Sequence, residues 1–157
     1  MNEKYIHIYN NLINYTRNKD LYKNLNREDN FSDRLTLFLL HFSFFLKNYK
    51  NEENKKILQE IYDYNFRQLE LSIREIGYGD ATVNKKMKSY VNLMYLIVDQ
   101  VELWEKLNLI EKTKFFSNLI EVNKESSFFI NYFNKYADYL SKKPLNYFTN
   151  DVISLKF

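Results

Sequence analysis

The chain has 157 residues, with 23 basic and 20 acidic side chains and a formal net charge of +3. This length predicts one domain over residues 1–157 that can bury a core, and the small charge excess lacks the clustered bias of dedicated nucleic-acid binders, so no DNA partner is expected. The chain contains no cysteine, which excludes disulfides and thiolate metal sites and fits an intracellular location.

The N-terminal segment predicts a helix over about residues 3–17. Its core-facing residues recur at helical spacing, namely Tyr5, Ile8, Tyr9, Leu12 and Thr16. The first residues show no basic start followed by an apolar run, so no signal peptide is expected. A polar connector follows over residues 18–30, with Leu21, Tyr22 and Leu25 as its expected anchors.

The next helix is predicted to start near Asp33, with Ser32 as its N-cap. Residues 35–46 are almost continuously apolar, and His41 and Ser43 are among the few interruptions. A membrane-spanning helix needs roughly 20 apolar residues. The shorter run therefore favours a helix at the centre of the core, and a surface that touches a membrane is the alternative.

Two long helices are predicted around the only two glycines of the chain. The first covers about residues 52–76, with an apolar stripe that runs from Leu58 to Ile76. Gly77 stands where a left-handed residue would end it, and Asp80 or Thr82 is expected to cap the next helix. That helix continues to about residue 106, and its predicted core stripe includes Met94, Tyr95, Val98 and Trp104.

Two more helices are predicted over about residues 109–122 and 125–140, the second ended by Pro144. Residues 145–157 fit either a short helix or an extended segment on the bundle. The sequence thus predicts an all-α, single-domain bundle of about six helices. Its 14 Tyr and 13 Phe fit either a surface for an apolar client or A/T-rich codon usage with an aromatic-rich core, and we favour the second interpretation for most positions.

No residue pattern selects catalytic chemistry. His41 has no second histidine nearby and no cysteine to complete a metal site, so a hydrogen-bonded core or interface histidine is the favoured interpretation. The segment 77–79 lacks the spacing of a phosphate-binding loop. We therefore expect no enzyme, no metal and no cofactor. An enzyme that uses His41 with a carboxylate of the 52–76 helix is kept as an alternative.

A basic cluster opens the second long helix. Lys85, Lys86 and Lys88 follow the glycines closely, although positive charge opposes the helix dipole at an N-terminus. One interpretation is an ordinary solvated face. The other is a patch that attracts an anionic partner, which could be an acidic protein surface, RNA or anionic lipid.

Residues 73–88 resemble the motif of the ubiquinol–cytochrome c chaperone family. That motif reads roughly leucine-arginine-glutamate-methionine-glycine-valine-glycine-aspartate, followed by a short spacer and a basic helix start. Its first eight positions are taken here by Ile73, Arg74, Glu75, Ile76, Gly77, Tyr78, Gly79 and Asp80. Lys85, Lys86 and Lys88 match the basic positions.

Weaker similarity extends to both sides of this motif. It places Tyr9, Arg17 and Tyr22 on recurring positions of the family's first helix, and Arg34, Leu40 and His41 on its apolar helix. Downstream, Asn118 matches the asparagine of a short arginine-asparagine motif, but Ser117 replaces the arginine. A family segment phenylalanine-tyrosine-glycine-arginine keeps only its first half here, as Met94 and Tyr95.

The resemblance implies an assembly factor that binds newly made cytochrome b, or another apolar membrane-protein client, and helps to build the ubiquinol–cytochrome c reductase complex. A small partner protein, the ribosome or a membrane surface are further partners that it leaves open, and it places the protein in the cytoplasm or at the inner face of the respiratory membrane. The partner-binding candidates are Arg34, His41, Arg74, Glu75, Gly77, Tyr78, Gly79, Asp80, Lys85, Lys86 and Lys88. The competing hypothesis is a generic helical protein-interaction or RNA-binding module without a client.

Overall fold

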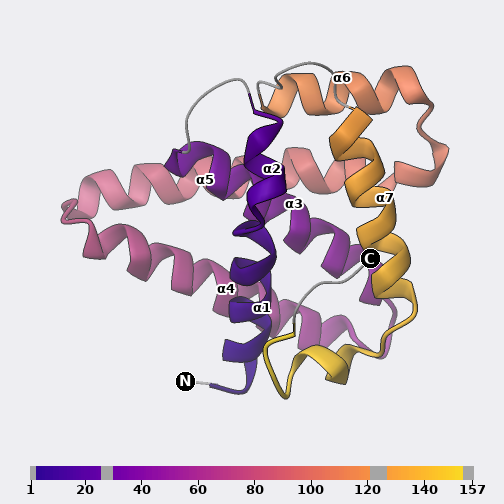
Figure 1. Cartoon of the computed structure of the whole chain (residues 1–157). Helices are drawn as coiled ribbons and strands as arrows, with labels where there is room; N and C mark the ends of the chain where they lie inside the picture. The colour runs from indigo at the N-terminus through magenta and orange to yellow at the C-terminus, as the bar shows by residue number, and fades with distance from the viewer. Residues whose placement is uncertain (1–2, 26–29, 121–126, 154–157) are drawn as a thin grey trace.

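The computed structural model describes residues 3–25, 30–120 and 127–153, and confirms the predicted all-α fold (Figure 1). The described residues form seven α-helices, one of them a short helix that the sequence did not predict, and three 3-10 helices. In chain order they are η1 (Glu3–Tyr5), α1 (Ile6–Thr16), α2 (Lys19–Lys23), α3 (Phe31–Tyr49), α4 (Lys55–Glu75), α5 (Asp80–Glu102), η2 (Trp104–Lys106), α6 (Leu109–Leu119), α7 (Ser127–Ser141) and η3 (Leu145–Phe148).

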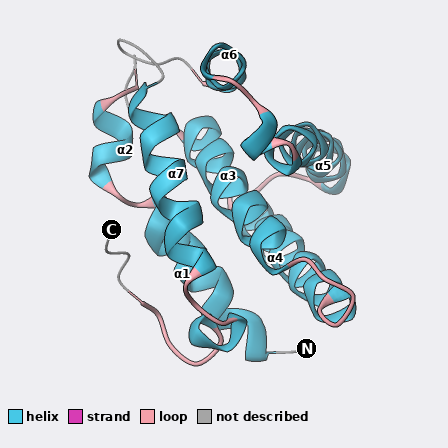
Figure 2. Ribbon diagram, turned by 90° about the vertical axis from the view of Figure 1, so that its right-hand side faces the viewer, coloured by secondary structure: helices cyan, strands magenta, loops and turns pink. Residues whose placement is uncertain are grey.

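Helix α3 is the centre of the arrangement. It contacts α1 and α7 on one side and α5 on the other, and Figure 2 shows it between these two groups, with α5 at one outer edge and α2 at the other. Helices α4 and α5 form a hairpin whose turn lies far from α6 and α7, at the left of Figure 1. The predicted role of α3 as the central core helix is confirmed.

The start of α3 differs from the prediction by a few residues. Asn30, not Ser32, is the N-cap, because its extended backbone lets its side-chain oxygen accept a hydrogen bond from the Asp33 backbone N–H at 2.9 Å. The Asn30 amide in turn donates to the Asp33 carboxylate at 3.0 Å. The helix therefore begins at Phe31. No helix in the described part of the chain has both the length and the hydropathy that crossing a membrane requires.

The core is built mainly from aromatic rings. Phe44, Phe116 and Phe133 lie at its centre, with the ring of Phe133 stacked on Phe44 at 5.1 Å and on Phe116 at 5.8 Å between centroids. Within residues 3–25, 30–120 and 127–153, the exposed aromatic side chains are Phe31, Tyr78 and Tyr95. Most aromatic side chains therefore pack in the core, in agreement with the interpretation of an aromatic-rich core that we favour from the composition.

His41 lies inside this aromatic core and is fully buried. The Leu37 carbonyl 2.7 Å from Nδ1 can only accept, so Nδ1 carries the proton. Nε2 then accepts a hydrogen bond from the Tyr132 hydroxyl at 2.7 Å. Burial lowers the pKa of His41 from 6.5 to about 4, against a smaller opposite effect of the Leu37 hydrogen bond. The interpretation as a satisfied core histidine is confirmed.

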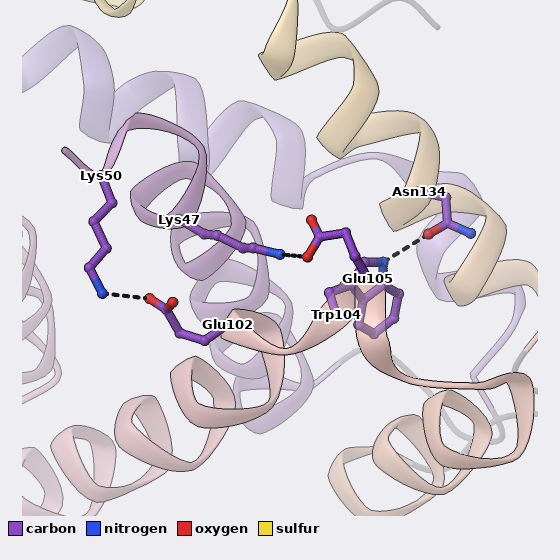
Figure 3. A network of polar contacts seen from close by, with 6 residues as sticks. All are labelled: Lys47, Lys50, Glu102, Trp104, Glu105 and Asn134. Atoms are coloured by element: carbon purple, nitrogen blue, oxygen red, sulfur yellow. Dashed lines mark hydrogen bonds and ion pairs between the residues drawn. The ribbon is translucent and has the colours of Figure 1, made fainter.

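Polar contacts pin the end of α5 to the bundle (Figure 3). The buried Trp104 donates its indole N–H to Asn134 of α7 at 2.8 Å. Lys47 of α3 pairs with Glu105, and this hydrogen bond is the main cause of the lowered pKa of Glu105. Lys50 pairs with Glu102 at 3.2 Å. The helix predicted to continue to residue 106 therefore ends at Glu102, where the chain turns into η2.

The start of the first helix, the start of α4 and the C-terminal tail also differ from the prediction. The first helix starts as a 3-10 turn, and α4 begins at Lys55 because residues 51–54 form a turn. The C-terminal tail combines both predicted alternatives, since η3 is followed by an irregular segment held on α1. Asn11 fixes that segment by donating to the Phe148 and Asp151 carbonyls and by accepting from the Ile153 N–H. The predicted helix ends at residues 121–122 and 125–126 lie outside the described residues.

Candidate interaction surface

The turn between α4 and α5 takes its shape from one glycine. Gly77 has φ +107°, a conformation that residues with a side chain rarely adopt, and its N–H donates to the Arg74 carbonyl at 3.0 Å. The predicted left-handed helix end is confirmed. Gly79 has φ −74° and stands as N-cap of α5, so its backbone conformation is open to any residue. The cap predicted at Asp80 or Thr82 is wrong, because Asp80 is already the first helical residue.

We expect Gly77→Ala to lower the free energy of unfolding by about 1–2 kcal/mol, because alanine is strained at positive φ. A Cβ at Gly77 or at Gly79 would meet no atom within 4 Å, so steric overlap contributes at neither position. Gly79→Ala is therefore the matched control and is expected to be neutral within about 0.5 kcal/mol. Urea unfolding of both variants measures the difference, and equal losses would contradict the role of the Gly77 conformation.

An ion pair closes the turn on one side. Arg74, near the end of α4, donates to the Asp80 carboxylate at the start of α5 and lies 3.8 Å from Glu70. The Asp80 carboxylate in the first turn of α5 also favours that helix through its dipole. Glu75, next to Arg74, is exposed. The geometry thus gives Arg74 and Asp80 a bracing position across the turn.

The outer side of the turn is apolar and basic. Ile76 and Tyr78 are 59% and 43% exposed. The predicted apolar stripe of α4 is therefore buried as far as Ile73 but not at Ile76, where the helix ends. The Lys86 ammonium lies over the Tyr78 ring, 4.9 Å from its centroid. Lys85 and Lys88 are exposed on the same first turns of α5. We call residues 74–88 the hairpin tip.

Two of the predicted candidates lie away from the hairpin tip. Arg34, on the first turns of α3, lines a pocket of about 190 Å³ together with Arg17 and with apolar side chains of α1, α3 and α4. His41 is enclosed by the core and presents no atom to the surface, so as a direct partner contact the prediction is wrong. The remaining nine candidates share the hairpin tip.

A second exposed surface was missed by the sequence analysis. Tyr95 and Leu96, in the middle of α5, are 61% and 65% exposed, although Tyr95 was assigned to the core stripe. The buried stripe of α5 runs instead through Val83, Met94, Ile97 and Val101. Exposed apolar residues continue from α5 into the first turn of α6, and together we call them the outer strip: Tyr95, Leu96, Leu103, Leu109 and Ile110.

A sequence signal for the outer strip exists in retrospect. Consecutive residues of a helix point about 100° apart, so Tyr95 and Leu96 cannot share a face with Met94 and Ile97 as well. An apolar segment wider than one stripe either lies in the centre of a core or leaves one side exposed. Because α5 lies at the outer edge of the bundle (Figure 2), its second side remains uncovered by the described residues.

His41 and the carboxylates of α4 lie in different parts of the fold. Across residues 3–25, 30–120 and 127–153, no group of three histidine, cysteine or acidic side chains is placed to hold a metal ion. His41 has both ring nitrogens engaged inside the core, whereas the α4 carboxylates are exposed or partly exposed, namely Glu60, Asp63, Glu70 and Glu75. His41 and the α4 carboxylates therefore do not share a site, which the alternative of an enzyme built on them would require.

Comparison with known proteins relates the chain to a protein family. A family model described as ubiquinol-cytochrome C chaperone matches residues 23–103, just over half of the chain. The matched residues run from the end of α2 through α5, and thus contain the whole hairpin tip and the α5 part of the outer strip. Tyr9, Arg17, Tyr22 and Asn118 lie outside them. No curated protein and no solved structure matches the chain significantly.

Proposed function

The chain belongs to the ubiquinol–cytochrome c chaperone family, and from this premise we propose that it is an assembly chaperone of the ubiquinol–cytochrome c reductase with newly made cytochrome b as its client. The observation that carries the proposal is the family match over the α3, α4 and α5 scaffold. In this proposal the protein works at the inner face of the membrane that holds the reductase.

The outer strip supports a client of membrane-protein type. It consists of four aliphatic side chains and one tyrosine on α5, at its C-terminal end and on the first turn of α6, each 45–68% exposed. Apolar surface of this kind is stabilised when an apolar segment of another protein covers it. An unassembled membrane protein offers such segments until its own helices pack.

The chemistry that this function needs is reversible binding. A chaperone that covers apolar segments and releases them requires no nucleophile, metal or cofactor, and the outer strip provides contact area without a deep cavity. Polar side chains interleave with it, namely Asn92, Asp99 and Gln100. This mixture favours moderate affinity, which lets the client leave when its assembly partners arrive.

We expect loss of this protein to lower the level of cytochrome b, and the double substitution Leu96→Asp with Leu103→Asp to fail to restore it. Two carboxylates on the outer strip would have to be desolvated by an apolar client, which costs far more than the hydrophobic contact returns. We expect at least a tenfold loss of cytochrome b co-purified with tagged protein. Immunoblotting of cytochrome b in the complemented deletion strain measures both effects.

The matched control adds the same charge to the same helix. Asn92→Asp with Gln100→Glu introduces two carboxylates between or beside the leucines but removes no apolar side chain, and all four positions are exposed. We expect this control to restore cytochrome b. A normal level of cytochrome b in the deletion strain would contradict the client assignment. If neither double variant restored cytochrome b, the effect would come from the added charge and not from the loss of the apolar side chains.

A further inference from the structure

The hairpin tip is a convex projection. The Phe31 ring at the start of α3 contacts Tyr90 of α5 at 6.4 Å between centroids, so residues 80–89 extend past the end of α3. Ten helical residues at 1.5 Å each correspond to about 15 Å. Ile76 and Tyr78 stand exposed at the turn that ends this projection, which is the part of the hairpin farthest from α6 and α7 (Figure 1).

The charge of the hairpin tip is positive. Four cations, Arg74 and the three lysines, stand against two carboxylates, Glu75 and Asp80. Asp80 is already paired with Arg74. Among the described residues, Lys85, Lys86 and Lys88 form no ion pair with a carboxylate within 4.0 Å. Within residues 74–88, the exposed carboxylate of Glu75 likewise has no ion pair to a described residue. The lysines are thus available to an anionic partner.

We propose that the hairpin tip inserts into the interface of a bilayer rich in anionic lipid. Ile76 and Tyr78 enter the headgroup region, and Lys85, Lys86 and Lys88 meet the lipid phosphates. A tyrosine ring has an apolar body and a polar hydroxyl, which suits this boundary, and lysine stems lie along apolar surface while the ammonium reaches the phosphate.

A bilayer fits this surface better than RNA or an acidic protein does. A convex tip needs a matching pocket on a protein partner, whereas lipid headgroups rearrange around it. Binding to RNA phosphates would leave the exposed Ile76 without a role.

This inference does not rest on the client assignment, and it adds a consequence to it. Leu96 lies sixteen residues along α5 from Asp80, which corresponds to about 24 Å. A hairpin tip anchored in the bilayer would therefore hold the nearest residues of the outer strip, Tyr95 and Leu96, within about 24 Å of the tip, on the side of the membrane where apolar segments of a membrane protein emerge. The two surfaces are separate in sequence and can be inactivated one at a time.

Co-sedimentation with vesicles tests the charged half of the proposal. The unmodified protein is expected to bind vesicles of phosphatidylglycerol mixed with phosphatidylcholine and to leave pure phosphatidylcholine vesicles unbound. Each lysine near an anionic surface contributes about fivefold, so the triple change of Lys85, Lys86 and Lys88 to Gln should weaken binding about 100-fold. The matched control removes three exposed lysines elsewhere, by changing Lys106, Lys114 and Lys135 to Gln, and should keep most of the binding.

Fluorescence tests the apolar half. Tyr78→Trp should shift its emission to shorter wavelength when anionic vesicles are added, because its ring enters the interface. Tyr95→Trp, at an exposed position on the outer strip (61% exposed, against 43% for Tyr78), should show no shift. The change of Ile76 and Tyr78 together to Ser should weaken vesicle binding at least tenfold, with thermal melting used to confirm that the variant is folded.

Several results would overturn the proposal. These are equal binding to neutral and anionic vesicles, unchanged binding by the Lys85, Lys86 and Lys88 variant, and unchanged emission of the Tyr78→Trp variant. Tight, salt-dependent binding to RNA without vesicle binding would also overturn it and assign the lysines to RNA. None of these results bears on the level of cytochrome b, so the client assignment stands or falls on its own experiment.

Discussion

Phe133→Ala is expected to lower the free energy of unfolding by about 3–5 kcal/mol, the usual cost of removing a buried phenylalanine. Phe133 is fully buried and joins three helices, since its ring stacks on Phe44 of α3 and Phe116 of α6 and touches His41 at 5.1 Å. The cavity would open where these rings converge. Domains of this size have a free energy of unfolding of about 5–15 kcal/mol, so this single change removes a large share of it. Urea unfolding of the variant and the unmodified protein measures the difference.

Two controls separate packing from aromatic character. Phe133→Leu keeps most of the volume and should cost only about 1–2 kcal/mol. Tyr95→Ala removes an aromatic side chain that is mostly exposed, and should change stability by less than about 0.5 kcal/mol. If Tyr95→Ala proved as destabilising as Phe133→Ala, the division between core and surface aromatics described above would be wrong.

The helices were predictable because their signals are local. The apolar run of 35–46, the Gly77 helix stop and the spacing of α4 depend on neighbours within one or two turns, and the structure keeps all three. The N-cap of α3 was predicted wrongly because two neighbouring residues suit that position equally well in sequence. Asn30 and Ser32 are both good caps, and the structure uses Asn30 because its side chain and Asp33 bond each other in both directions.

The hairpin tip could be predicted because it combines the only glycines of the chain with a cluster of lysines. The only two glycines and three lysines stand within twelve residues, and Arg74 and Asp80 face each other once Gly77 reverses the chain. The outer strip could not be predicted with the same means. Tyr95 and Leu96 resemble core residues in sequence, and their exposure follows from the edge position of α5, which is a property of the whole arrangement.

The placement of His41 shows a different limit of sequence. A histidine within an apolar helix could face a partner or the core, and the periodicity of α3 does not distinguish the two because this helix is buried on nearly all sides. Tyr132, 91 residues away along the chain, supplies the hydrogen bond that satisfies Nε2 of the buried imidazole. Such a long-range pairing leaves no mark in the local pattern.

Acid is expected to destabilise the protein through His41. The unfolded chain binds a proton at this imidazole below pH 6.5, but the folded protein does so only below about pH 4, because burial lowers the pKa. The unfolded state therefore holds more protons throughout this window, and stability falls as pH falls from 6.5 towards 4. Between pH 7 and pH 5 this amounts to about 2 kcal/mol, a loss that urea unfolding at several pH values would reveal.

Two variants assign this loss to the buried imidazole. His41→Gln cannot take up a proton, so its free energy of unfolding should be lower at pH 7 but should change much less between pH 7 and 5. His7→Gln removes the other histidine of the chain and keeps His41, so it should retain the loss of about 2 kcal/mol. A pH dependence that survives in His41→Gln would show that other groups cause it.

The Tyr132→Phe variant tests the hydrogen bond to His41. Without the hydroxyl that donates to Nε2, the neutral imidazole loses its partner. The free energy of unfolding at pH 7 should therefore fall, and its further loss between pH 7 and 5 should become smaller.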